Sequence, residues 1–374
     1  MARLDVGGIM DQKLKVGILG GTGMVGQRFI ALLEDHPWFE VTAIAASPRS
    51  AGKTYEDAIG GRWKMATPMP ASVKKIVVQD VSDVQDVAAK VDFVFSAVDM
   101  TKDEIRKIEE EYAKAETPVV SNNSAHRWTP DVPMVVPELN PEHFEVIESQ
   151  KKRLGTSRGF IAVKPNCSIQ SYTPALTALK KAGFEPKTVV ATTYQAISGA
   201  GKTFKDWPEM EHNIIPFIGG EEEKSEQEPL RIWGRVEDGQ IVKADGPIIT
   251  TQCVRVPVLD GHTAAVFVTF EEGKKPTKEE ILKAWKEFSG LPQELGLPSA
   301  PKQFIQYLEQ DNRPQVSMDV DYEDGFGISM GRLREDAVFD WKFIGLSHNT
   351  VRGAAGGGLL TAELLTAQKY ITAK

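Results

Sequence analysis

The sequence predicts an α/β protein of two domains, and three observations carry this prediction. The segment Leu14–Leu19 is short and apolar, and it runs directly into a glycine-rich loop and then a helical pattern from Gln27 to Leu33. Short apolar runs alternate with helical patterns up to about residue 160, as in a parallel sheet with both faces covered. Beyond this point the runs are longer, richer in Val, Ile and Thr, and alternating, which indicates a largely antiparallel sheet with one covered face. The expected fold is therefore a Rossmann-type dinucleotide-binding domain plus an α+β domain.

Residues 1–163 supply the elements of the first domain. After Leu14–Leu19, the strand candidates are Val41–Ala46, Lys75–Val78, Val91–Ala97 and Pro118–Val120. The charged segment Lys102–Lys114 carries Ile105, Ile108 and Tyr112 at helical spacing and predicts an amphipathic helix. We place the domain boundary near Ile161–Pro165, where the short apolar runs give way to longer, alternating ones.

Residues 164–348 form the expected second domain. Its strand candidates are Thr188–Tyr194, Ile248–Val258 and Thr263–Phe270. The remaining segment, 349–374, begins with a glycine cluster and continues with a helical pattern over Leu359–Ile371. We expect this last helix to return to the first domain.

Composition excludes several classes of protein. The 374 residues are 41% hydrophobic and 26% charged, as in globular proteins, and 44 Lys and Arg against 52 Asp and Glu give a net charge of −8. This balance argues against a nucleic-acid partner, which needs a basic face. No apolar run reaches the 18 to 20 residues or so that cross a bilayer, and Met1–Lys13 lacks the apolar core of a signal peptide. We therefore expect no membrane association and a cytoplasmic location.

The glycine-rich loop indicates a dinucleotide site. Gly21, Gly23 and Gly26 satisfy G-x-G-x-x-G, which lets a pyrophosphate approach the backbone at the start of a helix. The alternative is a tight strand-to-helix turn without a ligand. The predicted cofactor loop comprises Gly20, Gly21, Thr22, Gly23, Met24, Val25 and Gly26.

The second strand candidate ends without the acidic residue typical of NAD-binding domains. About twenty residues beyond the last glycine, the chain has Ser47, Arg49 and Ser50 instead. A guanidinium flanked by hydroxyls suits a 2′-phosphate, which a carboxylate would repel. We predict NADP rather than NAD, and the alternative is a solvated loop arginine.

Cys167 is the candidate nucleophile. It follows a short apolar run and precedes a helical pattern over Tyr172–Leu179, so the positive end of a helix is expected to lower its pKa. The alternative is a small buried apolar residue, which describes Cys253 better because it lies within a strand-like run. His262, in a turn between two strand candidates, is the first choice of proton shuttle, and His348 is the second. No histidine has metal-ligand spacing with a cysteine, so no metal is predicted.

Eight segments in order resemble the aspartate-semialdehyde dehydrogenase family, in particular its archaeal and fungal branch. They are GILGGTGMVGQRFIALLEDHP, AASPRSAGKTY, SNNSAHRWTPDVPMVVPELNPEH, KPNCS, TYQAISGAG, IPFIGGEEEK, CVRVPVLDGHT and LSHNTVRGAAGG. The resemblance runs from Gly17 to Ala362. It implies reversible conversion of β-aspartyl phosphate and NADPH to aspartate semialdehyde, phosphate and NADP, on the branch leading to lysine, methionine and threonine. It further implies that the second domain is the catalytic and dimerisation domain of a homodimer or homotetramer.

The resemblance also implies roles for individual residues. Cys167 matches the nucleophile, His262 the acid/base catalyst and Gln195 the residue that orients the acyl intermediate. The substrate-binding set comprises Arg255 for the α-carboxylate, Glu221 for the ammonium group, Lys224 and Arg127 for phosphate, and Asn166 of the cysteine motif. Further cofactor contacts fall on Ser198, Gly199, Gly201, Asn349 and Gly353. Taken alone, Glu221–Lys224 is equally a solvated helix start, Arg127 a surface cation and Gly353–Gly358 a site of close helix packing.

One segment departs from the family pattern, and three rival functions remain. After Gly201 the branch usually continues with an aromatic residue, Pro and Gly, but this chain has Lys202–Phe204. Malonyl-CoA reductase shares the thiol, the histidine and NADPH, but its substrate has no ammonium for Glu221 to bind. N-acetylglutamyl-phosphate reductase differs in its cysteine segment and glycine loop. A non-enzymatic NADP-sensing protein would need no reactive thiol.

Overall fold

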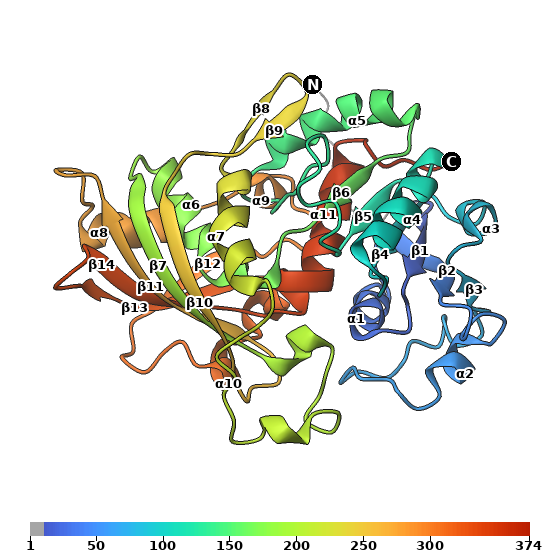
Figure 1. The fold of residues 1–374 in the computed structure, drawn as a ribbon, viewed down its shortest axis with the longest axis horizontal. Coiled ribbons are helices and arrows are strands. Elements are labelled where there is room, and N and C mark those ends of the chain that lie inside the picture. Colours follow the sequence, from blue (N-terminus) through green and yellow to red (C-terminus); the bar gives the residue numbers. More distant parts are fainter. Residues whose placement is uncertain (1–10) are drawn as a thin grey trace.

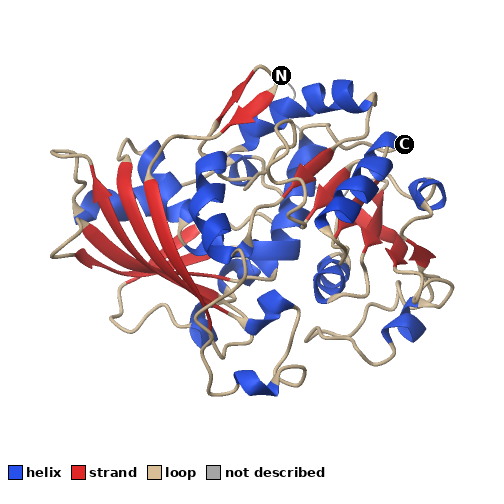
Figure 2. Cartoon of the chain, viewed as in Figure 1, coloured by secondary structure: helices blue, strands red, loops and turns tan. Residues whose placement is uncertain are grey.

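A computed structural model describes residues 11–374 of the chain. The argument against a signal peptide falls largely on residues 1–10, outside the described part. Two six-stranded sheets lie side by side with helices between and around them (Figure 1). Figure 2 shows the alternation of strands and helices in the right-hand part and the long strands of the left-hand sheet. The α/β prediction with two sheets is confirmed.

The first sheet is parallel throughout and has the strand order β3-β2-β1-β4-β5-β6, as in Rossmann folds. In that order its strands are Gln79–Asp80, Phe39–Ala46, Leu14–Leu19, Phe93–Ser96, Val119–Ser121 and Ile161–Val163. The strand predicted at Lys75–Val78 is wrong. Val77 makes only an isolated bridge with Thr54, and its side chain is 54% exposed. The third strand of the chain, β3, begins at Gln79 instead.

Helices cover both faces of this sheet. They are α1 (Met24–Leu32), α2 (Tyr55–Ile59), α3 (Val84–Ala88), α4 (Lys102–Lys114), the short η1 (Pro141–Glu145) and α5 (Val146–Leu154). Helix α4 has the predicted bounds because Thr101 and Glu104 form a capping box at its start. Its apolar face buries Ile105, Ile108 and Tyr112.

The second sheet is mixed, with the order β10-β7-β11-β14-β13-β12. In that order its strands are Ile248–Arg255, Pro186–Gln195, His262–Phe270, Trp341–Ser347, Ile328–Glu335 and Ile305–Leu308. The central pairings are antiparallel, whereas the edge strands β10 and β12 run parallel to their neighbours. Burial alternates along β10 and β11, so the prediction of one covered face is confirmed.

The other elements of this half pack around the second sheet or project from it. The helices are α6 (Thr173–Lys181), α7 (Glu221–Ile232), α8 (Lys278–Glu287), α9 (Leu291–Glu294) and α10 (Val316–Asp319). Short turns occur at η2 (Cys167–Ser171), η3 (Ile197–Ala200), η4 (Pro208–Met210) and η5 (Tyr322–Gly325), and β8 (Arg235–Glu237) pairs with β9 (Gln240–Val242).

The C-terminal helix α11 (Gly356–Ala367) returns to the first sheet. It follows a π-helical turn, η6 (Val351–Ala355), and it is buried from Gly356 to Leu365 between the two halves (Figure 1). It begins inside the glycine cluster rather than at Leu359. Gly358 lies against Phe29 of α1, where an added Cβ would come within 3.0 Å of the ring. The packing of the two halves therefore runs through this helix.

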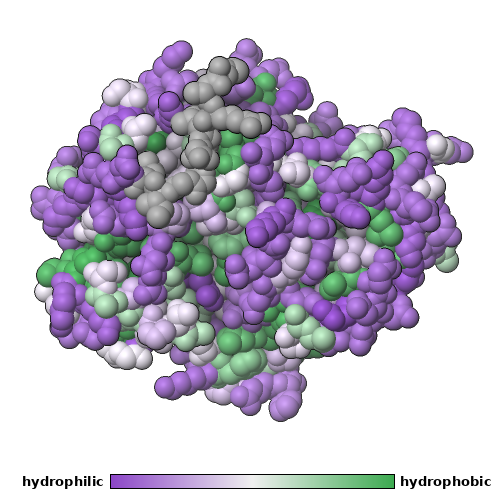
Figure 3. Space-filling model, turned by 180° about the vertical axis from the view of Figure 1, so that it is seen from behind, coloured by the Kyte–Doolittle hydropathy of each residue, from purple (hydrophilic) through white to green (hydrophobic). Residues whose placement is uncertain are grey.

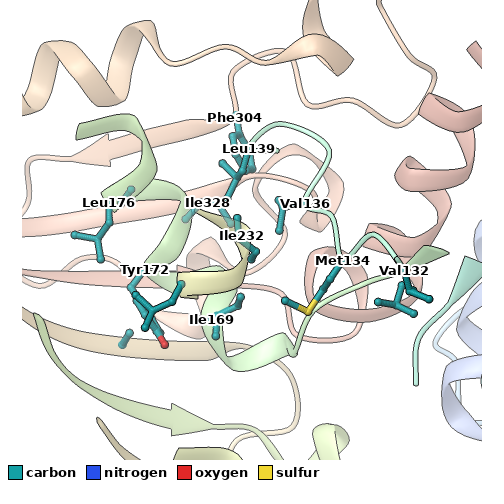
Figure 4. Packing of buried hydrophobic residues seen from close by; sticks show 14 of the residues in the cluster. Val132, Met134, Val136, Leu139, Ile169, Tyr172, Leu176, Ile232, Phe304 and Ile328 are labelled. Carbon is teal, nitrogen blue, oxygen red and sulfur yellow. The ribbon is translucent and has the colours of Figure 1, made fainter. Parts of the chain in front are cut away.

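The segment that follows Cys167 packs into a continuous apolar core. Figure 4 shows Ile169 of η2, Tyr172 just before α6 and Leu176 of α6, beside Met134, Ile232 and Ile328. All of these side chains are buried.

The face of the molecule in Figure 3 is mostly hydrophilic, with smaller apolar areas between the hydrophilic ones. No helix within residues 11–374 is long and apolar enough to cross a membrane.

Candidate active site

Cys167 and His262 meet where the two halves of the chain join. Cys167 is the first residue of η2, just after β6, and His262 is the first residue of β11. Their side chains lie 3.3 Å apart, Sγ to Nε2. The fold thus brings together a thiol and an imidazole that are 95 residues apart in sequence.

The surroundings of His262 fix which ring nitrogen carries the proton. The Ala196 N–H donates to Nδ1 at 3.0 Å, so the neutral imidazole carries its proton on Nε2, facing the sulfur. Burial, and then the nearby Arg255, lower the pKa of His262 to about 3. At neutral pH the ring is therefore an uncharged hydrogen-bond donor to Sγ.

The prediction that a helix N-terminus lowers the pKa of Cys167 is wrong for this structure. Burial, and then Glu221, raise the pKa of the thiol to about 11, against the opposing effects of Lys164, Arg127 and Arg255. The turn η2 is only a five-residue 3₁₀ segment, and α6 begins six residues after the sulfur. The helix dipole acts only within its first turn, so burial and Glu221 outweigh it.

An acidic group beside the thiol is held by three neighbours. Glu221 starts α7 and accepts hydrogen bonds from Asn166 Nδ2 at 2.9 Å and Gln195 Nε2 at 3.1 Å. Lys224 Nζ lies 3.4 Å from Glu221 Oε1, because the two residues share one helix face. The alternative of a solvated helix start does not hold for Glu221, which is only 9% exposed and faces inward.

Arg255, at the end of β10, points one edge of its guanidinium at the protein. Its Nη1 donates to Ala196 O at 2.6 Å, and the side chain is buried. Gly199 lies directly against it, since an added Cβ would come 3.0 Å from Nη1 and 3.4 Å from the His262 ring. Glycine at this position therefore keeps open the space in front of both side chains.

Arg127 is buried rather than a surface cation. Its guanidinium donates to Lys164 O at 3.0 Å and Asn122 O at 3.2 Å, and Nη1 pairs with Glu228 at 3.3 Å. Glu228 also accepts from the Asn166 N–H at 2.6 Å. Arg127 thus reaches the same turn as the thiol, while the partly exposed Lys224 is the more accessible cation.

A cleft of about 850 Å³ opens beside the glycine loop, between the two halves of the chain. Thr22, Gly23, Met24 and Val25 line one wall. Most of the rest of the lining comes from Ala97–Asp99, Asn122–Asn123, Ala200, Gly201, Thr203, Lys205 and Asp206. Gly26 is required for the loop to pack, because an added Cβ would lie 2.3 Å from Gly20 O. Among residues 11–374, the N–H groups of Met24 and Val25, at the start of α1, have no hydrogen-bond partner. Such a loop suits a phosphate.

The departing segment Lys202–Phe204 borders this cleft. Lys202 Nζ lies 4.6 Å from the centroid of the Trp207 ring, and Thr203 lines the cleft. Lys64, from the first half of the chain, donates to Gly201 O at 3.0 Å and to Asp206 Oδ2 at 2.9 Å. These contacts join the two walls across the cleft.

Two family profiles and several relatives match the sequence of this chain over most of its length. Residues 15–147 match the profile described as semialdehyde dehydrogenase, NAD binding domain, and residues 176–352 match semialdehyde dehydrogenase, dimerisation domain. The aspartate-semialdehyde dehydrogenase of Methanothermobacter thermautotrophicus is 45% identical, covering 94% of this chain and 99% of that protein. The Aspergillus fumigatus enzyme of the same name is 41% identical over 96% of this chain and 99% of its own length. The chain belongs to the aspartate-semialdehyde dehydrogenase family.

A solved structure from the same family has the same fold. The crystal structure of Candida albicans aspartate semialdehyde dehydrogenase with NADP has a TM-score of 0.87 and 40% identity, covering 96% of this chain and all of that one. The family resemblance seen in the eight sequence segments is therefore confirmed.

The predicted NADP residues of this family member fall into two groups. Arg49 follows β2; it is exposed, and its guanidinium has no hydrogen-bond or ion-pair partner within the described chain. Ser47 is also exposed, and Ser50 is buried with its N–H bonded to Ser47 O. Within the described part of the chain, Arg49 is therefore an exposed and unpaired cation just after the end of β2.

Ser198 and Asn349 instead bind the protein. Ser198 Oγ donates to Asp260 at 2.7 Å and accepts from Asn349 Nδ2 at 2.8 Å, while Asn349 Oδ1 accepts from the Gly261 N–H. Asn349 is 1% exposed. The pair fixes the turn before His262. Gly201 lines the cleft, and Gly353 packs on Cys167.

Sequence reasoning missed three side chains in this aspartate-semialdehyde dehydrogenase fold. Lys164 stood inside the KPNCS segment, Glu228 lay in a charged helix, and Asp260 preceded the histidine, but no pattern distinguished them. Their roles depend on contacts between distant segments. Cys253 is fully buried, as expected from its strand position. His348 is buried, and its Nδ1 accepts from the N–H groups of Thr350 and Val351.

Proposed function

We propose that this chain converts β-aspartyl phosphate and NADPH reversibly to aspartate semialdehyde, phosphate and NADP, through a thioester on Cys167, in the biosynthesis of lysine, methionine and threonine. The observation that carries the proposal is the 3.3 Å contact between Cys167 and His262, with charged side chains arranged around it. Residues 1–163 and the returning segment 349–374 would bind the cofactor, and residues 164–348 would supply catalysis and dimerisation. A cytoplasmic location belongs to the same proposal.

The residues around the glycine loop fit NADP. The free N–H groups at the start of α1 would meet the pyrophosphate, and the unpaired Arg49 would meet the 2′-phosphate. No carboxylate ends β2 to repel that phosphate. When bound, NADPH supplies the hydride that reduces the thioester. The NADP of the Candida albicans structure supports this assignment.

The site would bind the carboxylate, the ammonium group and the phosphate of the substrate with different charged side chains. The guanidinium of Arg255 has a free edge for the α-carboxylate, because within the described part of the chain only Nη1 is engaged. Glu221 would meet the ammonium group, and its hydrogen bonds from Asn166 and Gln195 hold it in place. Lys224 and Arg127 would bind the phosphate. Charged contacts of this kind contribute about 1.5 to 3 kcal/mol each.

The thiol would lose its proton to solvent and attack as the thiolate. His262 stabilises the sulfur anion by donating its Nε2–H, and the C–O bond to phosphate breaks as the C–S bond forms. The Asn166 and Ser168 N–H groups are already engaged by Glu228 and the Asn166 side chain. The Cys167 N–H is therefore the backbone donor left for the oxyanion. As the aldehyde forms, its C=O bond is restored, the C–S bond breaks and the electron pair returns to Cys167 Sγ, where the Nε2–H of His262 would again stabilise the thiolate.

Malonyl-CoA reductase and an NADP-sensing protein are the competing functions. Glu221 favours the aspartyl substrate, because a malonyl group offers no cation to this buried carboxylate. The test follows NADPH absorbance while the protein is offered aspartate semialdehyde with phosphate and NADP, and separately malonyl-CoA with NADPH. We expect turnover of the first only. Turnover of malonyl-CoA alone would overturn the substrate assignment, and turnover of neither would favour the sensor.

A homodimer or homotetramer would use the uncovered face of the second sheet. Tyr194 and Ile248 are 38% and 71% exposed on β7 and β10, and Val190 and Phe267 lie opposite each other on the same face of β7 and β11. An apolar sheet face of this kind is typical of a protein interface. Light scattering on the purified protein would give the mass of the assembly.

A further inference from the structure

Lys164 lies at the join between the two halves of the chain and is 3% exposed. Its backbone is fixed on both sides: the N–H donates to Ser121 O of β5 at 3.0 Å, and the carbonyl accepts from Arg127 Nε at 3.0 Å. The side chain therefore starts from a rigid position, three residues before the sulfur of Cys167.

The ammonium group of Lys164 joins two segments that are distant in sequence. Nζ donates to the carbonyl of Pro165, in the turn that leads to Cys167, and to the carbonyl of Gly353, in the π-helical turn η6. Gly353 packs directly on the nucleophile, since an added Cβ would lie 2.8 Å from Cys167 Cβ and 3.2 Å from Cys167 Cα. Lys164 thus clamps the turn that precedes Cys167 to η6, the turn that packs on Cys167.

The charge of Lys164 is not neutralised by direct contact. Among residues 11–374, no carboxylate lies within ion-pair distance of its Nζ, and both acceptors are backbone carbonyls. The charged and titratable groups that act on it most are Arg127, Cys167 and, from α7, Glu228 and Glu221. Burial, and then Arg127, lower the pKa of Lys164 to about 7. Burying an ammonium costs free energy that an apolar side chain of the same length would avoid, so a use for the charge is expected.

We propose that Lys164 is a positioning residue for Cys167, whose ammonium clamps the nucleophile turn to η6 and supplies the positive charge that stabilises the thiolate. The proposal deepens the proposed function, because it rests on Cys167 being the nucleophile. Arg255 and Arg127 also favour the thiolate. Arg255 has a guanidinium edge that is expected to bind substrate, and Arg127 is paired with Glu228, whereas within residues 11–374 no carboxylate lies within ion-pair distance of the lysine. The lysine would act in every step that needs ionised sulfur.

The test compares Lys164→Met, Lys164→Gln and Lys164→Arg with the wild type. The primary readout is the rate of Cys167 alkylation by iodoacetamide from pH 6 to pH 10, in a Cys253→Ala background and without substrate. We expect Met and Gln to slow alkylation by about tenfold or more at pH 6, where Lys164 keeps its proton, and by less at pH 8, where most of it is neutral, because each unit of pKa changes the thiolate fraction tenfold. Arg should restore most of the rate. In steady state, kcat should fall more than KM changes. Lys286→Met, at an exposed position of α8, is the matched control and should change neither quantity.

Unchanged alkylation in folded Lys164→Met, with unchanged kcat, would overturn the proposal. If the variants do not fold, the wild-type profile decides. The ammonium should lose its proton near neutral pH, so the logarithm of the alkylation rate should rise by less than one unit per pH unit there. A slope of one from pH 6 to pH 10 would contradict the proposal. Because alkylation needs no substrate, a failure of the protein to reduce or form aspartate semialdehyde would leave this comparison valid.

Discussion

Replacing Glu221 by Gln separates two effects of one carboxylate. Glu221 raises the pKa of the Cys167 thiol, so its neutralisation should lower that pKa and increase alkylation at pH 8. The same change removes the proposed partner of the substrate ammonium. Losing a charged contact of about 1.5 to 3 kcal/mol corresponds to a loss of roughly 10- to 150-fold in kcat/KM for aspartate semialdehyde. The variant should therefore carry a more reactive thiol and be a poorer enzyme.

The assay for this variant pairs iodoacetamide kinetics with NADPH absorbance. Gln retains the shape of Glu, so the hydrogen bond from Asn166 can survive. Glu223→Gln is the matched control, because it removes the same charge two residues along α7 from an exposed side chain without a partner in the described chain. Slower alkylation together with an unchanged kcat/KM would refute both parts of the reasoning.

Three further predictions concern a substrate contact, the cofactor and stability. Arg255→Leu should raise KM for aspartate semialdehyde by roughly 10-fold or more while the thiol remains open to alkylation, and an unchanged KM would reject the carboxylate role. Arg49→Leu should raise KM for NADPH by about tenfold and leave KM for NADH unchanged, and equal effects on both would argue against a 2′-phosphate contact. Burial raises the pKa of Glu109 from 4.5 to about 7, so folded protein binds an extra proton between these values and the free energy of unfolding falls as pH rises through that window. Glu109→Gln should remove up to about 3 kcal/mol of that fall in denaturant titrations at pH 5 and pH 8, and an unaltered pH dependence would contradict the assignment.

The sequence predicted the alternation of strands and helices in the first sheet, but it missed β12, β13 and β14 of the second sheet and several pairings. The capping box at Thr101 is local, so α4 fell where predicted, whereas α1 begins at Met24, inside the glycine loop, rather than at the predicted Gln27. Lys75–Val78 had a strand-like composition, yet the pairing surface beside β2 begins at Gln79. Alternation along Ile248–Arg255 reported one-sided burial correctly, but it carries no information about strand direction.

The site shows the same division between local and distant causes. The motif around Cys167 identified the residue, whereas the pKa of its thiol depends on burial and on Glu221, 54 positions later. The proton position on His262 depends on the Ala196 amide, and Lys164 depends on the Gly353 carbonyl. None of these contacts has a signature in a single sequence, because each joins segments that only the folded chain places together.

The covalent intermediate on Cys167 is the most direct test of the account. The protein is incubated with aspartate semialdehyde and NADP in the absence of phosphate, quenched in acid and digested for mass spectrometry. The account predicts an aspartyl adduct on the peptide that contains Cys167, none on the peptide that contains Cys253, and loss of the adduct when phosphate is added before the quench. Absence of any adduct during turnover, or full activity in Cys167→Ser, would contradict it.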